Sequence, residues 1–324
     1  MVWTSRFLPS PAVRHWLLRI LTVAVVGIFI YQFGKVARQI DWPHFWQSLG
    51  RPGNWRYLTA ALVLMPVNWL LETRKWQLLL LPFLDWPFAK VFRATLAGVS
   101  VSAATPNRVG EIGGRMLLAR REEWPAVVAS SLLGSLCQWV AFLLLAWPAL
   151  VLTVGRLPRF DLPFSYWWLL PLGPLAVAIA AAGGKPLLLR IVNWTEGRLV
   201  GDATGLRESL TNVKLSLMSR ASVYATLRFL VYCVQLYLLL HFFGLGLPLI
   251  GGLAGIMAIY LVQAGIPLPP GLNLVTRTEL GLLLWSAGPE GAVAVLAAYT
   301  ALFGVNVLLP AVPGYWLIVR KNYV

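Results

Sequence analysis

Long apolar runs separated by short polar breaks form the dominant pattern of this chain. The apolar runs cover residues 17–33, 57–71, 125–154, 162–182, 221–243, 249–266 and 290–319. Most of them approach or exceed the roughly twenty residues that an α-helix needs to cross a bilayer. Within each run the apolar residues lack the strict alternation of a transmembrane strand. The pattern therefore predicts an all-α, polytopic integral membrane protein with about seven to eight transmembrane helices.

Composition supports a membrane location for the whole chain. Of the 324 residues, 58% are hydrophobic and 12% are charged, whereas a soluble domain has about 25% charged residues. We expect one transmembrane domain over residues 1–324, with no soluble catalytic domain attached. The net charge of +15 fits anionic lipid headgroups. We expect no nucleic-acid partner, because no soluble basic domain is present to bind one.

The residue types that bind metals and form disulfides are scarce. Cys137 and Cys233 both lie within apolar runs, where cysteine behaves as a small hydrophobic residue. The three histidines, His15, His44 and His241, do not cluster along the chain. We therefore expect neither a disulfide nor a metal site, and no cofactor.

Basic residues set the expected orientation in the membrane. Residues 1–19 carry three arginines and lead into the apolar run 17–33, which lacks a small-residue cleavage pattern. We interpret this run as a retained first transmembrane helix with a cytoplasmic N-terminus. Residues 183–220 form a basic, amphipathic segment that we also place in the cytoplasm. The expected location is the cell (inner or plasma) membrane, as a multi-pass protein.

The first notable polar break, at residues 104–115, interrupts sequence that is otherwise apolar enough for a membrane. The apolar run before this break is too short to span a bilayer. We predict that residues 91–118 form a re-entrant hairpin of two half-helices, which is tolerated where protein or water surrounds the backbone. Glu111 is expected in the first turn of the returning half-helix, where a carboxylate is favoured. The predicted turn residues are Thr105, Pro106, Asn107 and Gly110.

A second break covers residues 267–279, and a short apolar piece follows at residues 280–285. Like the first break, it has a proline-containing turn, here Pro270 and Gly271, followed by an arginine and a glutamate. Paired interruptions in two parts of a chain indicate a transporter binding site. We therefore predict a second re-entrant hairpin at this place, facing the first.

The two breaks divide the chain into candidate halves, residues 57–182 and 221–319, joined by the amphipathic segment 183–220. The long apolar run after each break starts similarly, with Pro125-Ala-Val-Val in the first half and Gly291-Ala-Val-Ala in the second. The similarity is weak residue by residue. Internal duplication is one reading of this pattern, and independent halves are the other.

Charged residues also separate two apolar stretches, residues 57–71 and 76–84. Glu72, Arg74 and Lys75 lie in this gap. One alternative is a single long helix that carries the charges at mid-depth, and the other is a helix end whose side chains snorkel to the surface. The i,i+3 spacing of Glu72 and Lys75 allows a local ion pair.

The two breaks together resemble a known family. The stretch Thr105-Pro-Asn-Arg-Val-Gly-Glu-Ile-Gly-Gly-Arg115, with the later Pro-Pro-Gly and Glu279, is similar to the lysylphosphatidylglycerol synthase transmembrane region, also described as flippase-like. The resemblance covers nearly the whole chain by the order and spacing of motifs. It implies a helical polytopic fold with re-entrant segments, and lipid translocation or lipid-linked processing. The matching positions are Pro106, Arg108, Gly110, Glu111, Arg115, Pro270, Gly271 and Glu279.

Two departures from the family pattern leave the substrate open. Asn107 occupies a position where the family usually has glycine, and residues 271–279 are longer and poorer in glycine than the family's second motif. Family members that transfer aminoacyl groups also need a separate soluble domain. Because the sequence ends at Val324, we do not expect that synthase activity here.

The leading functional hypothesis is a lipid flippase or transporter that moves an anionic phospholipid or a lipid-linked intermediate. Arginine suits a phosphate because its planar fork binds two oxygens at once. Glutamates would balance these charges in the empty site. The predicted substrate-binding residues are Arg108, Glu111, Arg115, Arg277, Glu279, Asn107, Thr105, Glu72 and Arg74.

Three other readings stay open. The pairs Arg108–Glu111 and Arg277–Glu279 could serve as internal ion pairs that pin the hairpins. A membrane enzyme on a lipid-linked substrate would need a nucleophile with an acid or base, and no Ser-His-Asp arrangement appears, so we do not expect an enzyme. The third reading is a non-catalytic assembly partner of a cell-envelope complex. Self-association into a homo-oligomer is left open.

Overall fold

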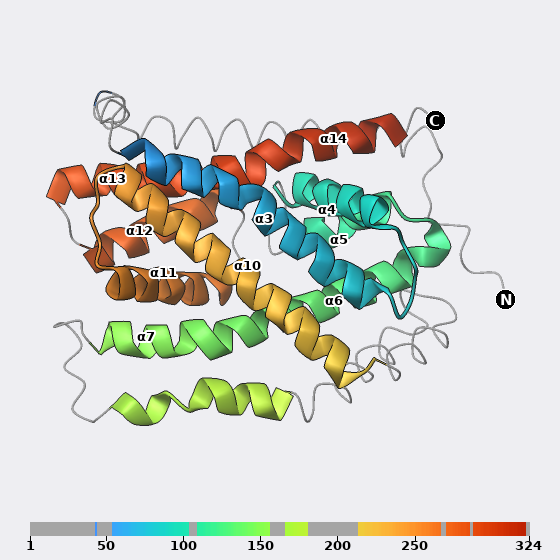
Figure 1. Cartoon of the computed structure of the whole chain (residues 1–324), viewed down its shortest axis with the longest axis horizontal. Coiled ribbons are helices and arrows are strands. Elements are labelled where there is room, and N and C mark those ends of the chain that lie inside the picture. The colour runs from blue at the N-terminus through green and yellow to red at the C-terminus, as the bar shows by residue number, and fades with distance from the viewer. Residues whose placement is uncertain are drawn as a thin grey trace, which may run out of the picture.

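The computed structural model describes residues 54–103, 109–155, 166–180, 213–266, 270–285 and 288–321, together with Pro43. Every regular element within these ranges is a helix (Figure 1). The prediction of an all-α protein is therefore confirmed for the described part of the chain. The predicted first helix at residues 17–33, most of the amphipathic segment and residues 104–108 of the first break lie outside these ranges.

The first series of helices begins with one long element. α3 (Trp55–Leu80) is continuous through the charged positions, so the alternative of a helix that ends near Glu72 is wrong. Two short helices follow, α4 (Phe88–Ser102) and α5 (Val109–Leu117). A long interrupted helix comes next, made of the 3₁₀ turn η2 (Arg121–Glu123), α6 (Trp124–Ala141), the π-helical turn η3 (Phe142–Ala146) and α7 (Trp147–Val154).

The second series repeats this order of long, short, short and interrupted long helices. Its elements are α10 (Leu215–Phe242), α11 (Leu249–Ala264), α12 (Pro270–Trp285), α13 (Gly288–Phe303), the π-helical turn η5 (Gly304–Leu308) and α14 (Leu309–Lys321). The π-helical turn starts at residue 142 in one series and at residue 304 in the other, a shift of 162 positions. Pro148 and Pro310, which follow these turns, are separated by the same shift. Between the series lie η4 (Tyr166–Leu169) and a short apolar helix.

The helices of the two series also pack in corresponding ways. α3 and α10 run in opposite directions side by side through the centre (Figure 1), where Gln235 Nε2 donates to the Ala61 carbonyl at 2.9 Å and Asn54 Nδ2 donates to the Phe242 carbonyl at 3.2 Å. α4 packs against α14, and its counterpart α11 packs against α7. This is the arrangement expected of two repeats with inverted orientation.

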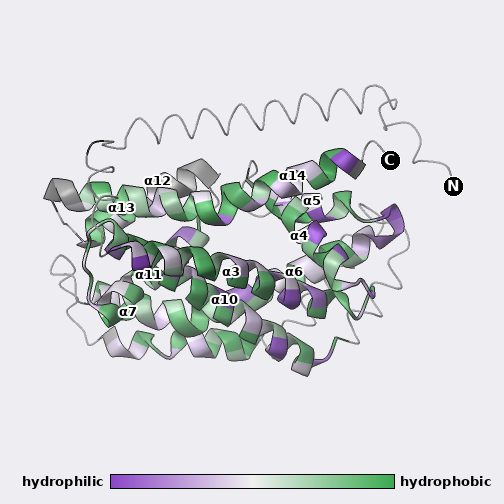
Figure 2. Cartoon of the chain, turned by 45° about the horizontal axis from the view of Figure 1, so that its top comes forward, coloured by the Kyte–Doolittle hydropathy of each residue, from purple (hydrophilic) through white to green (hydrophobic). Residues whose placement is uncertain are grey.

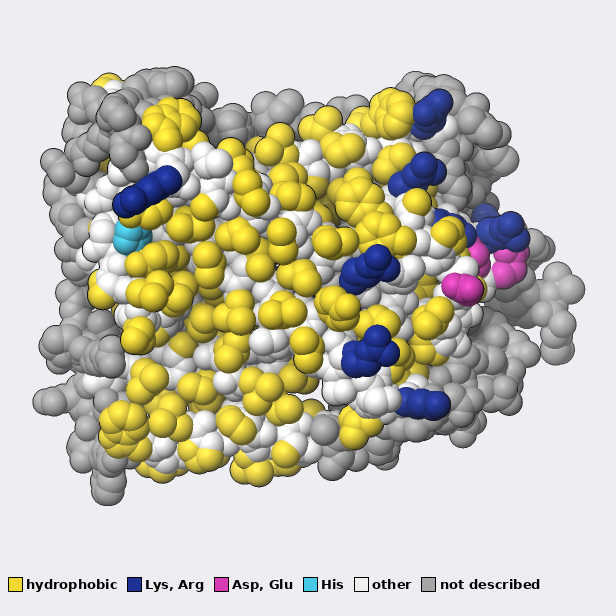
Figure 3. All heavy atoms as spheres, viewed as in Figure 1, with side chains coloured by type: hydrophobic (Ala, Val, Ile, Leu, Met, Phe, Trp, Pro, Cys, Tyr) yellow, Lys and Arg dark blue, Asp and Glu magenta, His cyan; other side chains and the backbone are white. Residues whose placement is uncertain are grey.

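Within the described ranges, three helical stretches are long and apolar enough to cross a membrane: Arg121–Val154, Leu215–Phe242 and Gly291–Arg320. Apolar positions dominate the helices (Figure 2), and apolar side chains cover a broad face of the molecule (Figure 3). In the view of Figure 3, most lysines and arginines gather at one end of this face. A wide apolar surface with charges at its margin is typical of a protein that contacts lipid.

The second pair of short helices differs from its prediction. α11 has 16 residues, fewer than the roughly twenty needed to span a bilayer, although the run 249–266 was expected to span. α12 starts at Pro270, so Pro270 and Gly271 lie in its first turn, and the helix is longer than the predicted piece 280–285. α11 and α12 pack together as α4 and α5 do. The pair α11–α12 is therefore the counterpart of the pair α4–α5.

Glycines allow α4 to be approached closely from two sides. A methyl group at Gly114 of α5 would overlap the carbonyl oxygen of Ala97, and one at Gly314 of α14 would overlap that of Leu96. Ser100 also donates a 2.7 Å hydrogen bond to the carbonyl of Ala311 in α14. These contacts hold the short helix between its two neighbours, as the small residues of its sequence suggest.

Candidate functional site

A cavity of about 640 Å³ lies between the two series of helices. Its wall includes residues from the first series, such as Trp69 and Gln138, and from the second, such as Tyr260 and Tyr299. Both π-helical turns contribute to it, η3 through Phe142 and η5 through residues 306–307. Such π-helical turns often occur at functional sites. Among the described residues, the charged ones in the wall are Glu111, Arg228 and Arg277.

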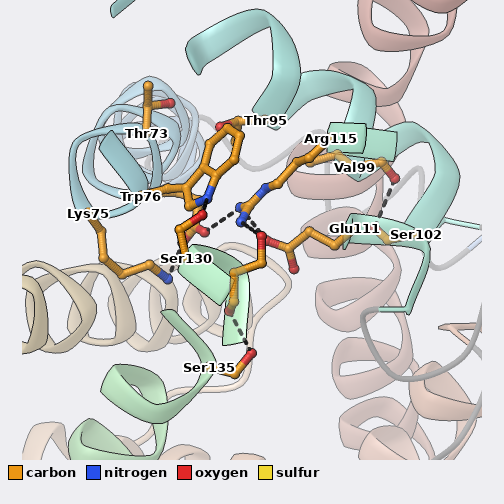
Figure 4. A network of polar contacts seen from close by, with 12 residues as sticks. Thr73, Lys75, Trp76, Thr95, Val99, Ser102, Glu111, Arg115, Ser130 and Ser135 are labelled. Atoms are coloured by element: carbon orange, nitrogen blue, oxygen red, sulfur yellow. Dashed lines mark hydrogen bonds and ion pairs between the residues drawn. The ribbon is translucent and has the colours of Figure 1, made fainter. Parts of the chain in front are cut away.

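Arg115 joins two carboxylates beside this cavity (Figure 4). One of its terminal nitrogens, Nη2, lies 2.9 Å from Glu72 Oε1 and 2.5 Å from Glu111 Oε1. The other, Nη1, donates to Ser131 Oγ at 3.1 Å. The guanidinium also lies over the Trp76 ring, 4.2 Å from its centroid. With 2% of its surface exposed, Arg115 is a buried cation whose charge is compensated by direct partners.

The position of Arg115 follows from how α5 packs. Arg115 and Glu111 are four residues apart on one helix, so both side chains project from the same face. Gly98 of α4 lies against this face, where an added methyl group would come within 2.8 Å of the Glu111 carbonyl oxygen and 3.3 Å of Arg115 Cγ. Gly98 thus packs against the backbone and inner carbons of these residues. The guanidinium of Arg115 extends past α4 to Glu72 of α3 and Ser131 of α6.

Glu72 is surrounded by three cations. In addition to Arg115, its carboxylate pairs with Lys75 Nζ at 2.6 Å and with Arg228 Nη1 at 3.2 Å. Glu72 and Lys75 are 2% and 1% exposed, so the prediction of their local pair is confirmed and the alternative of side chains that snorkel to the surface is wrong. With Glu111 included, the part of this network that lies in the described residues contains three positive and two negative side chains.

Arg277 approaches the same cavity from α12, with neutral neighbours. Its Nε donates to Gln263 Oε1 at 2.7 Å, and its Nη2 contacts the same oxygen. Its guanidinium lies over the Tyr260 ring, 4.9 Å from the centroid. An amide and an aromatic ring orient the guanidinium without cancelling its charge. Arg277 therefore brings a positive potential to the wall of the cavity.

Three amide side chains next to the cavity are joined in a row by hydrogen bonds. Asn68 Nδ2 donates to Asn306 Oδ1 at 2.8 Å, and Asn306 Nδ2 donates to Gln235 Oε1 at 3.1 Å. Gln235 Nε2 in turn donates to the Ala61 carbonyl. All three amides are at least 98% buried. Because buried amides are costly without partners, this row of hydrogen bonds fixes α3, α10 and η5 relative to one another.

The structure brings several predicted site residues together and separates others. Glu72, Glu111 and Arg115 form one network, and Arg277 lies in the wall of the adjacent cavity. Glu279, in contrast, is exposed. Gly110 lies in the first turn of α5. The predicted residues Thr105, Pro106, Asn107 and Arg108 lie outside the described ranges.

Arg74 occupies a different environment from its neighbours in the sequence. It is exposed, donates to Gln77 Oε1 at 3.1 Å, and lies over the Phe88 ring at 4.4 Å from the centroid. Arg74 comes two residues after Glu72, which places it on nearly the opposite side of α3 from that carboxylate. Arg74 is not among the residues that line the cavity.

Sequence reasoning did not assign Arg228 and Gln263 to the site. A signal for Arg228 was present, because an ionisable residue inside an apolar helix is a functional candidate by default. Gln263 gave a weaker signal as a polar residue near the end of an apolar run. Their partners lie far along the chain, on α3 and α12, so spacing alone does not reveal them.

Comparison with known proteins agrees with the motifs and the fold. A search of curated proteins found no match. The model of one protein family, described as the lysylphosphatidylglycerol synthase TM region, matches residues 16–314. This match includes both helix series as far as residue 314, within α14, and the described charged residues of the network and the cavity wall. The chain therefore belongs to the family of the lysylphosphatidylglycerol synthase transmembrane region, a membrane domain with a lipid-related function.

Proposed function

We propose that this protein is a lipid flippase or transporter that moves an anionic phospholipid or a lipid-linked intermediate between the leaflets of the membrane. The headgroup would occupy the cavity between the two helix series, and the acyl chains would stay in the surrounding lipid. Transport of this kind requires no covalent chemistry from the protein. We accordingly propose a transporter and not an enzyme.

The observation that carries this proposal is the cation excess at a cavity enclosed by apolar helices. Arg228 and Arg277 both line the cavity, and only one carboxylate, Glu111, lines it among the described residues. Arg228 pairs with Glu72, whereas Arg277 has no carboxylate partner among the described residues, and an arginine in that state at membrane depth is costly unless an anion or water accompanies it. Guanidinium groups bind phosphate oxygens in pairs, which makes a phosphate headgroup the ligand that best offsets this cost.

The repeated helix order supports a mechanism for movement. In many transporters the substrate site lies between inverted repeats, and one repeat rocks against the other around it. We propose that the pairs α4–α5 and α11–α12 act as the two re-entrant hairpins, each closing one side of the cavity. Arg115 of α5 and Arg277 of α12 lie at equivalent places in these hairpins, 162 positions apart. Arg108, which we propose as a further ligand of the headgroup, lies outside the described residues.

The same reasoning gives a proposed location and orientation. We place the protein in the cell membrane, with the arginine-rich residues 1–19 and the basic segment 183–220 on the cytoplasmic side. The membrane lipid itself would be the main partner of the protein.

Lipid movement in reconstituted vesicles tests the proposal. Vesicles that contain the full chain and phosphatidylglycerol with a fluorescent acyl chain would be treated with dithionite, which destroys the fluorophore only in the outer leaflet. We expect the protein to expose the inner-leaflet lipid, so that fluorescence falls well below the half that remains in protein-free vesicles. Arg108→Ala should restore the protein-free result if the hairpin tip takes part. A wild-type chain that matches protein-free vesicles for every anionic lipid tried would contradict the proposal.

A further inference from the structure

The cavity reaches the outside of the protein along one side of α6, in the middle of a stretch long enough to span a membrane. Leu132 and Trp139 line the cavity, and 39% and 41% of their surface is exposed. They follow Arg121, the first residue of the stretch Arg121–Val154, by 11 and 18 positions. At a rise of about 1.5 Å per residue they lie about 17 and 27 Å along a helix of about 51 Å, within the central part that a hydrocarbon core of about 30 Å would surround.

The exposure of side chains around α6 locates the mouth of the cavity. Successive residues of an α-helix are about 100° apart around its axis. Leu132, Ser135 and Gln138 all line the cavity, and they are exposed, half-buried and buried in this order. Leu136 lies on the other side of Leu132 from Ser135, is exposed, and does not line the cavity. Leu132 therefore stands at the boundary between the outer surface of α6 and the interior of the cavity.

The interior behind this mouth is charged and partly accessible. The side chains of Glu111 and Arg228 line the cavity and are 21% and 20% exposed. Arg228 also pairs with Glu72. Arg277, which lies in the same wall, donates to the neutral Gln263. A cavity that joins charged groups to the hydrocarbon core at mid-depth fits a ligand with an ionic head and an apolar chain.

Trp139 gives a second observation at the mouth. Tryptophan is enriched at membrane surfaces, where its ring contacts apolar groups and its N–H meets polar ones. Trp139 lies instead near the middle of its stretch, with its ring edge-to-face against Phe142 at a centroid separation of 5.7 Å. The glycerol ester region of a lipid is polar and adjoins apolar chains, so it would supply the environment of a membrane surface at this depth.

We propose that the cavity opens sideways into the membrane at Leu132 and Trp139, and that this mouth holds the glycerol esters and first acyl carbons of a phospholipid whose headgroup lies inside. The ligand is then a membrane lipid that enters from the bilayer, and not a free phosphate that enters from water. Movement of this lipid between leaflets rests on the proposed function, whereas the mouth and the class of ligand rest on the cavity itself.

Photo-crosslinking of the full chain in phosphatidylcholine vesicles tests this inference. The probe is phosphatidylglycerol with a diazirine near the start of one acyl chain, and mass spectrometry locates the labelled residues. An excess of about tenfold of unlabelled phosphatidylglycerol, at a constant fraction of the probe, should lower labelling at Leu132 and Trp139 about five- to tenfold, because both lipids share a saturable site. Labelling at Val312, which is exposed on α14 outside the cavity, should not change. Labelling of Leu132 and Trp139 that is absent, or that persists unchanged in the excess, would overturn the inference.

A water-soluble phosphate distinguishes the two possible sources of the anion. Glycerol 1-phosphate carries a phosphate like that of the lipid but has no acyl chains. We expect it to leave the labelling at Leu132 and Trp139 unchanged at the concentration at which phosphatidylglycerol competes. If it competes as well as the lipid does, the cavity holds a soluble phosphate and the proposed mouth for acyl chains is wrong.

Leu132 and Leu136 provide a matched pair of variants. Both are leucines of α6 with 39% of their surface exposed, and of the two only Leu132 lines the cavity. Leu132→Trp fills the mouth and should lower the labelling at Trp139 that unlabelled lipid competes away, by at least about fivefold. Leu136→Trp extends into the surrounding lipid and should leave that labelling unchanged. Both substitutions are at exposed positions, so both variants should keep the unfolding midpoint of the wild type. Equal labelling at Trp139 in the two variants would contradict the proposed mouth.

The results separate this inference from the proposed function. If vesicles show lipid movement but no competed labelling occurs at Leu132 and Trp139, the proposed mouth is wrong and the transporter proposal stands. If the labelling is competed as expected but no lipid moves, the lipid site at the mouth is supported and the transporter proposal is wrong.

Discussion

Arg115 and Arg277 lie 162 positions apart, at equivalent places in the two helix series, yet of these two only Arg115 meets carboxylates among the described residues. Arg115 is 2% exposed and pairs with Glu72 and Glu111, whereas Arg277 donates to the neutral Gln263. The same side chain therefore has two environments in an otherwise repeated framework. Arg115 is suited to hold the helices together, and Arg277 is suited to bind an anion.

Replacement of Arg115 should destabilise the protein strongly. Arg115→Gln removes the cation shared by the buried Glu72 and the half-buried Glu111, and breaking a buried ion pair on one side costs about 3–5 kcal/mol. Thermal unfolding in detergent micelles would measure the loss. Arg74→Gln is the matched control, because Arg74 is exposed on the same helix series and its removal should change stability by less than about 0.5 kcal/mol. Equal stability of the two variants would show that Arg115 does not hold the network together.

The pair Glu72–Arg115 should show strong energetic coupling. Glu72→Gln removes one carboxylate from three cations, and Arg115→Gln removes one cation from two carboxylates, while the double variant removes one charge of each sign. The double variant should therefore be more stable than the sum of the two single losses predicts, by about 1–3 kcal/mol. A thermodynamic cycle of the four proteins, unfolded in the same detergent, measures this coupling. Simple additivity would mean that the two side chains act independently.

Neighbouring glycines of α5 should respond differently to the same substitution. Gly114→Ala would place a methyl group against the carbonyl oxygen of Ala97, which forces α5 away from α4 and costs about 1–3 kcal/mol. Gly113→Ala meets no atom within 4 Å and should be neutral or stabilising, by up to about 1 kcal/mol, because alanine favours a helix. Unfolding midpoints of both variants check this contrast. A loss of the same size at Gly113 would point to a different helix contact.

Local features of this site could be predicted from the sequence. The Glu72–Lys75 pair follows from its spacing on one helix, and the structure shows it at 2.6 Å. Glu111 falls in the first turn of α5, as its place after the break indicates. The contact between Arg228 and Glu72 could not be predicted, because it depends on the opposed course of α3 and α10 across the centre of the molecule.

Which residues of the two halves correspond could also not be predicted from the sequence. Matching Pro125 with Gly291 implies a shift of 166 positions, whereas the π-helical turns differ by 162. Small apolar residues such as alanine and valine recur throughout both long helices, so several registers fit them equally well. A shift of 162 positions aligns Arg115 with Arg277, whereas the alignment of Pro125 with Gly291 does not.

The most direct test of the central claim, that the cavity holds an anionic lipid headgroup, is the rate of lipid movement for a folded Arg277→Gln variant. Glutamine keeps a polar side chain next to Gln263 and Tyr260 but removes the positive charge from the cavity. Arg320→Gln, on an exposed arginine at the end of α14, serves as the control. With unfolding midpoints matched to the wild type, we predict that Arg277→Gln moves fluorescent phosphatidylglycerol at least about tenfold more slowly, since a charge-assisted hydrogen bond contributes about 1.5–3 kcal/mol. The control should retain the wild-type rate. An Arg277→Gln variant that is folded and moves anionic lipid at the wild-type rate would contradict the account.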